Sequence, residues 1–171
     1  MPDNPLDMTG KAVIITGGGK GVGRGITRRF LEAGADVLIC GRSEPEQPVE
    51  AGGRKAHFML ADVRDLDQLQ ALVDHATTAL GRLDVLVNNA GGSPAADAAT
   101  VSPRFSEAII RLNLIAPMNL AQKANAVMQQ QDEGGSIINI ASVSAVRPSP
   151  GTAAATARGC FPSYAAPCSS C

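Results

Sequence analysis

Long apolar runs and clusters of like charge are both absent from this chain of 171 residues. Its net charge is −1 and no basic patch stands out, so we expect no nucleic-acid partner. No segment approaches the ~20 apolar residues that span a bilayer. The first seven residues are polar and carry no apolar signal core. We therefore expect a cytoplasmic protein without a membrane partner, long enough to bury one domain core.

The cysteine pattern also argues against a disulfide scaffold or a metal site. Cys40 lies alone in an apolar segment, and the other three cysteines crowd the C-terminus. Cys168 and Cys171 have C-x-x-C spacing, but no histidine or second cysteine pair accompanies them to complete a zinc site. We predict no bound metal.

A glycine-rich segment near the N-terminus separates an apolar, β-branched run (12–15) from an amphipathic one. The spacing Gly17-x3-Gly21-x-Gly23 between a strand and a helix is typical of a site where a dinucleotide pyrophosphate meets a helix N-terminus. The segment lacks the Gly-Lys-Ser/Thr ending of a P-loop, which argues against an NTPase. The alternative is an ordinary glycine-rich turn.

Apolar runs and amphipathic segments then alternate along the chain. Strands are expected at 36–41, 57–61, 85–88 and 136–141, with a helix between about 66 and 80 and a long helix from about 105 to 131. Pro117 should kink the long helix. Segment 44–53, rich in Pro and Glu, is expected to be a loop. This order predicts an α/β fold, a Rossmann-like, doubly wound parallel sheet.

The residue that follows the second strand bears on the choice of nucleotide. Arg42 stands there without a carboxylate, and a guanidinium at this position suits the 2′-phosphate of NADP. Lys20 in the glycine segment could add a second charge. We predict that NADP(H) is preferred, with NAD(H) as the alternative; both cations could also be simply solvated.

Polar residues elsewhere allow more than one interpretation. Asp62 ends the third strand, where it could accept a hydrogen bond from the adenine amino group or cap the next helix. Asn113 lies near the kink and could reach a carbonyl or water that the distorted backbone leaves free. His75 falls beside an apolar stripe and is expected to be structural or exposed. The fifth strand delivers Ser142 to the same edge as the glycine segment.

Taken in order and spacing, these motifs resemble the classical short-chain dehydrogenase/reductase family, from about residue 11 to 154. The resemblance implies cofactor contacts from Thr16, Gly17, Gly19, Lys20, Gly21, Val22, Gly23, Arg42, Asp62, Val63, Asn89, Ala90 and Gly91. It also implies catalytic roles for Ser142, which would bind the substrate carbonyl, and Asn113, which would organise a water. The implied reaction is hydride transfer between a nicotinamide and a small-molecule carbonyl or alcohol.

The family's general acid and its partner are missing. The family pattern places a tyrosine where this chain has Ala155 and a lysine where it has Gly159, and Tyr164 lies too far along to replace the tyrosine. The sequence past Ala155 has no periodicity, which we interpret as a shifted reading frame or, alternatively, a divergent tail. We therefore expect an incomplete Rossmann domain over 1–155, an irregular tail over 156–171, low activity and marginal stability.

Two other functions fit the same features: a non-catalytic dinucleotide-binding module, or a fragment without function. The apolar stripe between Asn113 and Val127 would suit a homo-oligomer contact or packing on the sheet equally well.

Overall fold

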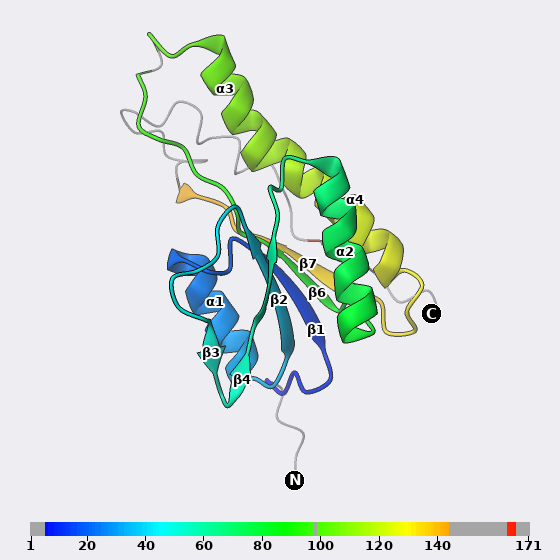
Figure 1. The fold of residues 1–171 in the computed structure, drawn as a ribbon. Coiled ribbons are helices and arrows are strands. Elements are labelled where there is room, and N and C mark those ends of the chain that lie inside the picture. The colour runs from blue at the N-terminus through cyan, green and yellow to red at the C-terminus, as the bar shows by residue number, and fades with distance from the viewer. Residues whose placement is uncertain (1–5, 98, 144–163, 167–171) are drawn as a thin grey trace.

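The computed structural model describes residues 6–97, 99–143 and 164–166. Its main feature is a six-stranded sheet in the order β5-β2-β1-β6-β7-β8, flanked by helices (Figure 1). The strands are β1 Ala12–Thr16, β2 Asp36–Gly41, β5 His57–Leu60, β6 Val85–Asn88, β7 Gly135–Asn139 and β8 Tyr164–Ala166. The helices are α1 Gly21–Glu32, α2 Leu66–Leu80, α3 Pro103–Ile110 and α4 Ala116–Met128, with a π-helical turn, η1, at Arg111–Ile115.

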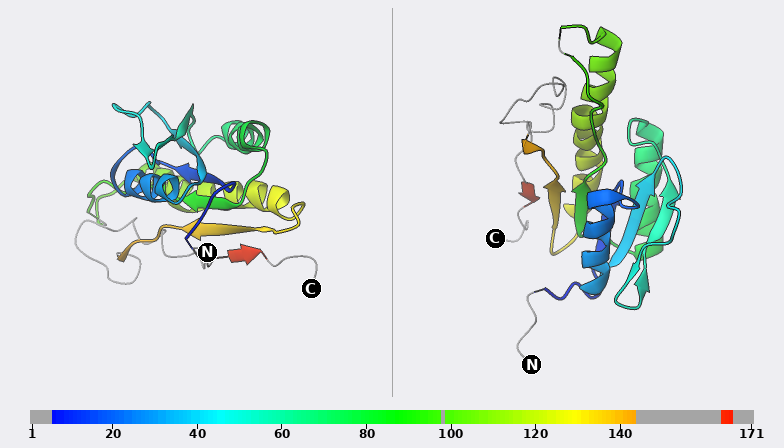
Figure 2. Two further views of the ribbon diagram at one scale, coloured as in Figure 1. Left: turned by 90° about the horizontal axis from the view of Figure 1, so that it is seen from below. Right: turned by 90° about the vertical axis from the view of Figure 1, so that its left-hand side faces the viewer.

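The first five strands of this sheet are parallel, as predicted. A sixth strand, which was not predicted, adds to these parallel strands. β8 runs antiparallel to β7, with Tyr164 opposite Ile137, and lies beside β7 at the outer edge of the sheet (Figure 2). The sheet is therefore mixed, and residues 164–166 of the tail are a strand rather than irregular chain. The rest of the predicted tail, together with positions 155 and 159, lies outside the described residues.

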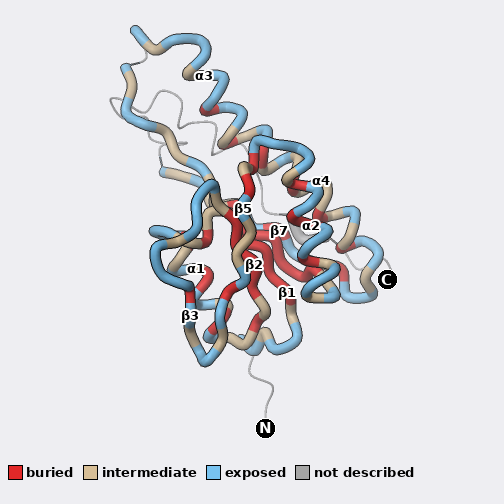
Figure 3. Tube along the Cα trace, viewed as in Figure 1, coloured by how far each residue is buried: buried red, intermediate tan, exposed pale blue. Residues whose placement is uncertain are grey.

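Two apolar layers cover the two faces of the sheet, because side chains alternate between faces along each strand. On one face, Val13 and Ile15 of β1 pack with Leu31 of α1. On the other face, Ile14 packs with apolar side chains of α2 and α4, among them Leu72. Helices on both faces make the sheet doubly wound, and the buried strands stand out in Figure 3. His75 on α2 is exposed, which was one of the two environments predicted for it.

A short hairpin replaces the loop expected at 44–53. Strands β3 (Glu50–Ala51) and β4 (Arg54–Lys55) pair antiparallel around Gly52 and Gly53. Both glycines have positive φ angles, +59° and +74°, which a two-residue hairpin turn of this kind requires. The hairpin packs against α1. It therefore belongs to the layer on the α1 face of the sheet, and in the sequence it lies between β2 and β5.

The long helix expected at 105–131 is present from 103 to 128 but changes its winding instead of simply kinking. A π-helical turn, η1, precedes Pro117, and α4 begins immediately after it. Proline has no N–H and its ring would press on the carbonyl four residues earlier, so the wider turn accommodates it. α3 extends beyond the carboxyl edge of the sheet (Figures 1 and 2).

Charged side chains join the strands at the opposite, amino edge. Asp84, at the start of β6, accepts hydrogen bonds from the Ala12 amide at 2.8 Å and from Arg82 Nη2 at 2.6 Å. Glu133 bridges Arg82 and Lys11. These contacts fix the relative positions of β1, β6 and the turn into β7.

Not every apolar side chain is covered. Ile138 of β7 is 39% exposed, and Ile115 and Met118 on the η1–α4 helix are similarly open. No helix in the described part of the chain is long and apolar enough to cross a membrane.

Candidate functional site

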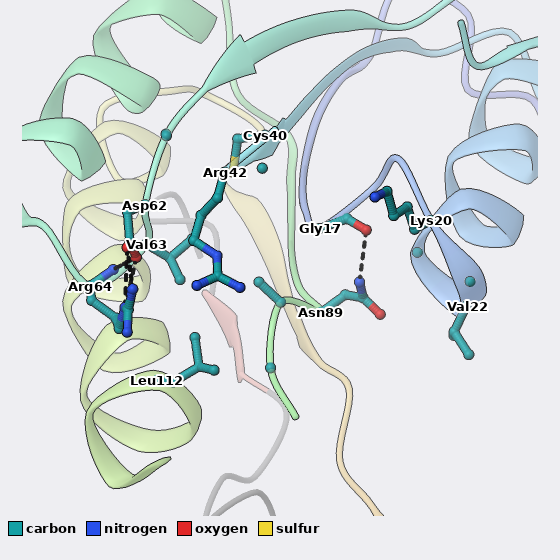
Figure 4. Close-up of a pocket in the computed structure, with 16 residues that line it drawn as sticks. Gly17, Lys20, Val22, Cys40, Arg42, Asp62, Val63, Arg64, Asn89 and Leu112 are labelled. Carbon is teal, nitrogen blue, oxygen red and sulfur yellow. Dashed lines mark hydrogen bonds and ion pairs between the residues drawn. The ribbon is translucent and has the colours of Figure 1, made fainter. Parts of the chain in front are cut away.

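A cavity of about 500 Å³ opens at the carboxyl edge of the sheet, next to the turn after β1. Its lining residues come from the ends of β1, β2, β5 and β6 and from α1 and η1: Gly17, Lys20, Gly21, Val22, Gly23, Cys40, Gly41, Arg42, Ala61, Asp62, Val63, Arg64, Asn89, Ala90, Gly91 and Leu112. This edge is where open α/β sheets bind ligands, and the volume is typical of a small-molecule site. The cavity brings together most of the predicted cofactor residues (Figure 4).

The turn after β1 requires glycine at two positions because a side chain there would not fit. Gly17 has a φ of +66°, and a Cβ there would lie 3.2 Å from the Ala90 Cα. At Gly23 a Cβ would lie 2.3 Å from the Gly17 carbonyl oxygen, so α1 can approach the turn only with glycine at this position. The Thr27 hydroxyl then binds the carbonyl of Gly18 at 3.0 Å and fixes the helix to the turn. The result is an open backbone cradle at a helix N-terminus.

Thr16 and Asn89 support this cradle. The Thr16 hydroxyl accepts hydrogen bonds from the amides of Asn89 and Ala90, at 3.0 and 2.9 Å, and donates to the Val87 carbonyl at 3.4 Å. The Asn89 side chain donates to the carbonyls of Thr16 and Gly17, at 2.9 and 3.4 Å. Thr16 is buried and does not line the cavity, so it ties the turn after β1 to the turn after β6.

The cavity lining carries a net positive charge, because Lys20, Arg42 and Arg64 face a single carboxylate, that of Asp62. Lys20 and Arg42 both line it, and neither makes a hydrogen bond or ion pair within the described residues. Figure 4 shows Arg42 between the Asp62–Arg64 pair and Lys20. Helix α1 begins here without a side-chain cap and without an acidic residue in its first turn. Free amides and two cations at one point favour an anionic ligand.

A smaller hollow of about 360 Å³ adjoins the cavity around the same two cations. Gly19, Ser43, Pro45 and Phe58 line it, so Gly19 lies beside this second hollow and not beside the main one. The space extends the site on the side where Arg42 follows β2.

The Asp62 carboxylate forms an ion pair with Arg64. Its two carboxylate oxygens accept hydrogen bonds from Arg64, including one of 2.5 Å from Nη2, and this contact lowers the pKa of Asp62. The alternative that Asp62 caps the following helix is wrong, because Asp65 caps α2 by accepting from the amides of Asp67 and Gln68. The sequence interpretation missed Arg64, although a basic residue two positions after an acidic one is the signal for such a pair.

Apolar residues fill out the walls. Val63 is buried, whereas Val22 is 68% exposed at the start of α1 and points an apolar surface toward the solvent beside the cradle. Cys40 and Leu112 also line the cavity, and neither was predicted to do so. Burial raises the pKa of the Cys40 thiol to about 12, so it remains protonated near neutral pH.

The two predicted catalytic residues lie outside the cavity lining. Asn113 is buried on η1 and binds Gly92 twice, accepting from its amide and donating to its carbonyl, each at 2.9 Å. The side chain therefore reaches a carbonyl, as expected, but on the turn after β6 and not on the distorted helix. Ser142 is half-buried just beyond β7, at the predicted edge of the sheet.

No three metal-ligating side chains gather anywhere in the residues that the structure describes. The cradle, the free helix N-terminus and the two cations fit a phosphorylated nucleotide, and the apolar walls fit its rings. The site is thus chemically suited to a dinucleotide.

Comparisons with known proteins point the same way. Residues 11–157 match the family model described as short chain dehydrogenase. A 3beta-hydroxysteroid dehydrogenase 2 from Eggerthella lenta is 34% identical over 90% of this chain and 61% of its own length. A 2-dehydro-3-deoxy-D-gluconate 5-dehydrogenase from Escherichia coli is 34% identical over 81% of this chain and 56% of its own.

A solved structure agrees with these relatives. The ligand-free aldohexose dehydrogenase of Thermoplasma acidophilum superimposes with a TM-score of 0.78 at 30% identity, over 90% of this chain and 57% of that one. The chain thus spans little more than half the length of the relatives it matches. The glycine cradle, the five parallel strands and the family match over most of the sequence agree, and the chain belongs to the short-chain dehydrogenase family of oxidoreductases.

Proposed function

We propose that this chain binds NADP(H) in preference to NAD(H), with Arg42 and Lys20 on the 2′-phosphate. The observation that carries the proposal is the presence in the cavity lining of Lys20 and Arg42, neither of which makes a hydrogen bond or ion pair in the described part of the chain. A ribose hydroxyl carries no charge to match these cations, whereas a phosphate would accept hydrogen bonds from the planar fork of Arg42. Gly17, Gly21 and Gly23 would hold the pyrophosphate on the α1 N-terminus, and Ala90 and Gly91 would border the nicotinamide.

The reaction we propose is oxidation or reduction of a small-molecule alcohol or carbonyl, the substrate class that the relatives' names suggest. The bound nicotinamide supplies or accepts the hydride. Ser142 would donate a hydrogen bond to the substrate oxygen. The Asn113 side chain is held by Gly92, so its part in ordering a water would fall to its main-chain carbonyl, from which Pro117 removes the usual helical donor.

Turnover by this chain should be weak. Ala155 and Gly159 stand where the family's tyrosine and lysine are expected, and loss of a positioned general acid typically lowers a rate by ~10²–10⁴. The same substitutions favour the alternative of a module that binds the dinucleotide without catalysis. We propose that residues 1–155 form an incomplete domain whose cofactor half is intact.

The test is a titration of the purified chain with NADPH and with NADH, followed by nucleotide fluorescence. Arg42→Ala should weaken NADPH binding by about tenfold to a hundredfold, the range for lost charged hydrogen bonds, and leave NADH binding unchanged. Arg28→Ala is the matched control, because Arg28 is exposed on α1 and does not line the cavity.

A chain restored in frame, with the tyrosine and lysine in place, separates binding from catalysis. Equal NADPH binding by both chains, with hydride transfer by the restored chain alone, supports the proposal. Binding of neither nucleotide by the 171-residue chain would refute it, and equal losses of NADPH and NADH in Arg42→Ala would refute the phosphate role.

A further inference from the structure

The chain that follows β2 has few attachments to the rest of the protein. Residues 43–48 form no helix or strand, and within the described structure their only hydrogen bonds are two that come from Arg24 on α1. Arg24 Nη1 donates to the Gln47 carbonyl at 2.9 Å, and Nη2 donates to the Pro48 carbonyl at 3.0 Å. The two terminal nitrogens of one planar guanidinium thus bind two successive main-chain oxygens, an arrangement that suits arginine better than lysine.

The same segment forms one side of the smaller hollow around the two cations. Ser43 and Pro45 line this hollow together with Lys20 and Arg42. Pro45 lies directly against the glycine turn after β1, because a Cβ built at Gly19 would be 3.1 Å from the Pro45 Cβ. The position of segment 43–48 therefore sets the width of the space that a phosphate would enter.

Arg24 connects this segment to the start of α1. It lies one helical turn after Lys20, and its amide donates to the Lys20 carbonyl at 3.0 Å. Its side chain holds the segment that begins next to Arg42, yet Arg24 lines neither the main cavity nor the smaller hollow. It can therefore act on a ligand there only through the segment or through its charge at a distance.

We propose that Arg24 is a positioning residue for nucleotide selectivity, which holds segment 43–48 so that Lys20 and Arg42 face one preformed hollow. This inference rests on the proposed function, since it needs a 2′-phosphate in that hollow. A segment that is already held in place adds little ordering cost when the phosphate binds. Without Arg24 this cost falls on NADPH, whose phosphate uses the hollow, and not on NADH.

The experiment measures the ratio of the NADH to the NADPH dissociation constant by calorimetric titration of the full chain and its variants. Arg24→Ala should lower this ratio by about threefold to tenfold, the range for loss of an exposed hydrogen bond, through weaker binding of NADPH alone. Arg24→Lys keeps the charge but not the paired donors, and it should lower the ratio as much. Arg28→Ala removes another α1 cation, one without a hydrogen bond in the described structure, and should leave the ratio unchanged.

A second measurement needs no nucleotide. The exposed Glu46–Gln47 bond lies within the segment, and its cleavage by a Glu-specific protease, located by mass spectrometry, reports how often the segment detaches. Arg24→Ala and Arg24→Lys should each accelerate this cleavage by at least about threefold. Arg28→Ala should not change it. Equal cleavage rates in all four chains would overturn the inference, because Arg24 would then not hold the segment.

The binding ratios separate the remaining outcomes. An unchanged ratio in Arg24→Ala would overturn the inference, and so would an unchanged ratio in Arg24→Lys, because charge alone would then suffice. An unmodified chain that binds NADPH no more tightly than NADH would refute the proposed function itself.

A variant on the other side of the segment guards against misfolding. Pro45→Gly removes the ring that lies on Gly19 and loosens the same segment while leaving Arg24 in place. It should lower the ratio by a similar factor, and an unchanged ratio would overturn the inference even if Arg24→Ala did not fold. Far-UV circular dichroism of each variant checks its fold.

Discussion

Gly23 and Gly25 lie on the same helix, yet a methyl group added at each would meet different surroundings. At Gly23 it would lie 2.3 Å from the main-chain oxygen of Gly17, whereas at Gly25 nothing lies within 4 Å. Backbone cannot move aside as a flexible side chain can. The first position therefore controls how closely α1 approaches the glycine turn, and the second controls only helix propensity.

We expect Gly23→Ala to destabilise the chain by about 1–3 kcal/mol, the range for overpacking, and to abolish nucleotide binding. Gly25→Ala should stabilise it by about 0.5–1 kcal/mol, because alanine favours an exposed helical position. Urea unfolding followed by circular dichroism measures both. Equal effects of the two substitutions would contradict the tight approach of α1 to the turn.

Cys40 should make the free energy of unfolding decrease as the pH rises through the alkaline range. Burial raises the pKa of its thiol from 9.0 to about 12, so the folded chain keeps a proton that the unfolded chain loses. This contribution to stability is complete below pH 9 and declines as the pH rises toward 12. The slope should approach 1.4 kcal/mol per pH unit, the value for one proton.

The measurement is the free energy of unfolding of the unmodified chain and of Cys40→Ala, from pH 8 to pH 10.5. The difference between the two should shrink above pH 9, since the variant has no thiol to ionise at this position. A difference that is constant over the whole range would show that Cys40 ionises in the folded state as easily as in the unfolded one.

At the scale of elements, one side chain joins the η1 turn to the turn after β6. Asn113 is buried and satisfies both the amide and the carbonyl of Gly92. Asn113→Ala leaves these groups unpaired, and we expect a loss of about 1–3 kcal/mol. Asn119→Ala on α4 is the control, because its side chain has no hydrogen bond in the described structure.

Chemical denaturation of both variants tests the link, and hydrogen exchange at Gly92 locates it. Asn113→Ala should speed exchange of the Gly92 amide, while Asn119→Ala should leave it unchanged. If the two variants lost equal stability, the contact would not hold the turn.

The sequence predicts those elements whose pattern is local. The glycine spacing around Gly17 and the apolar stripes of α2 and α4 are visible without any neighbour, and the structure has them where they were expected. The β3–β4 hairpin also had a local signal, the Gly52-Gly53 pair, which the prolines and glutamates nearby concealed. The cap of α2 was one of two roles predicted for Asp62, but Asp65 is the residue in register with the first turn.

Other features arise from contacts that spacing does not reveal. β8 exists because Tyr164 and its neighbours pair with β7, and three residues carry too little pattern to predict a strand. The Asp62–Arg64 pair depends on how the chain turns between β5 and α2. The π-helical turn before Pro117 is one of several ways to accommodate a proline, so the sequence indicated a distortion but not its form.

At the scale of the whole molecule, β7 has one covered face and one open face. Ile137 is 7% exposed and packs in the layer with α2 and α4, whereas Ile138 is 39% exposed on the other face. Ile137→Thr should destabilise the chain by about 2–4 kcal/mol through a cavity and a buried hydroxyl. Ile138→Thr should lie within about 0.5 kcal/mol of the unmodified chain.

Equilibrium unfolding measures these two changes, and light scattering measures self-association. We expect Ile138→Thr to reduce association at high protein concentration, since it removes an exposed apolar side chain beside a sheet edge. Equal destabilisation by both substitutions would mean that the open face is covered in solution.

The hydrogen bonds that join Thr16 to Asn89 and Ala90 have a consequence for binding kinetics. They hold the glycine cradle in shape between two strand ends, so a nucleotide meets a rigid site and its arrival need not wait for a loop to order. Lys20 and Arg42 would raise the association rates of all phosphorylated nucleotides to a similar extent. Selectivity among nucleotides should then reside in how long each one stays bound.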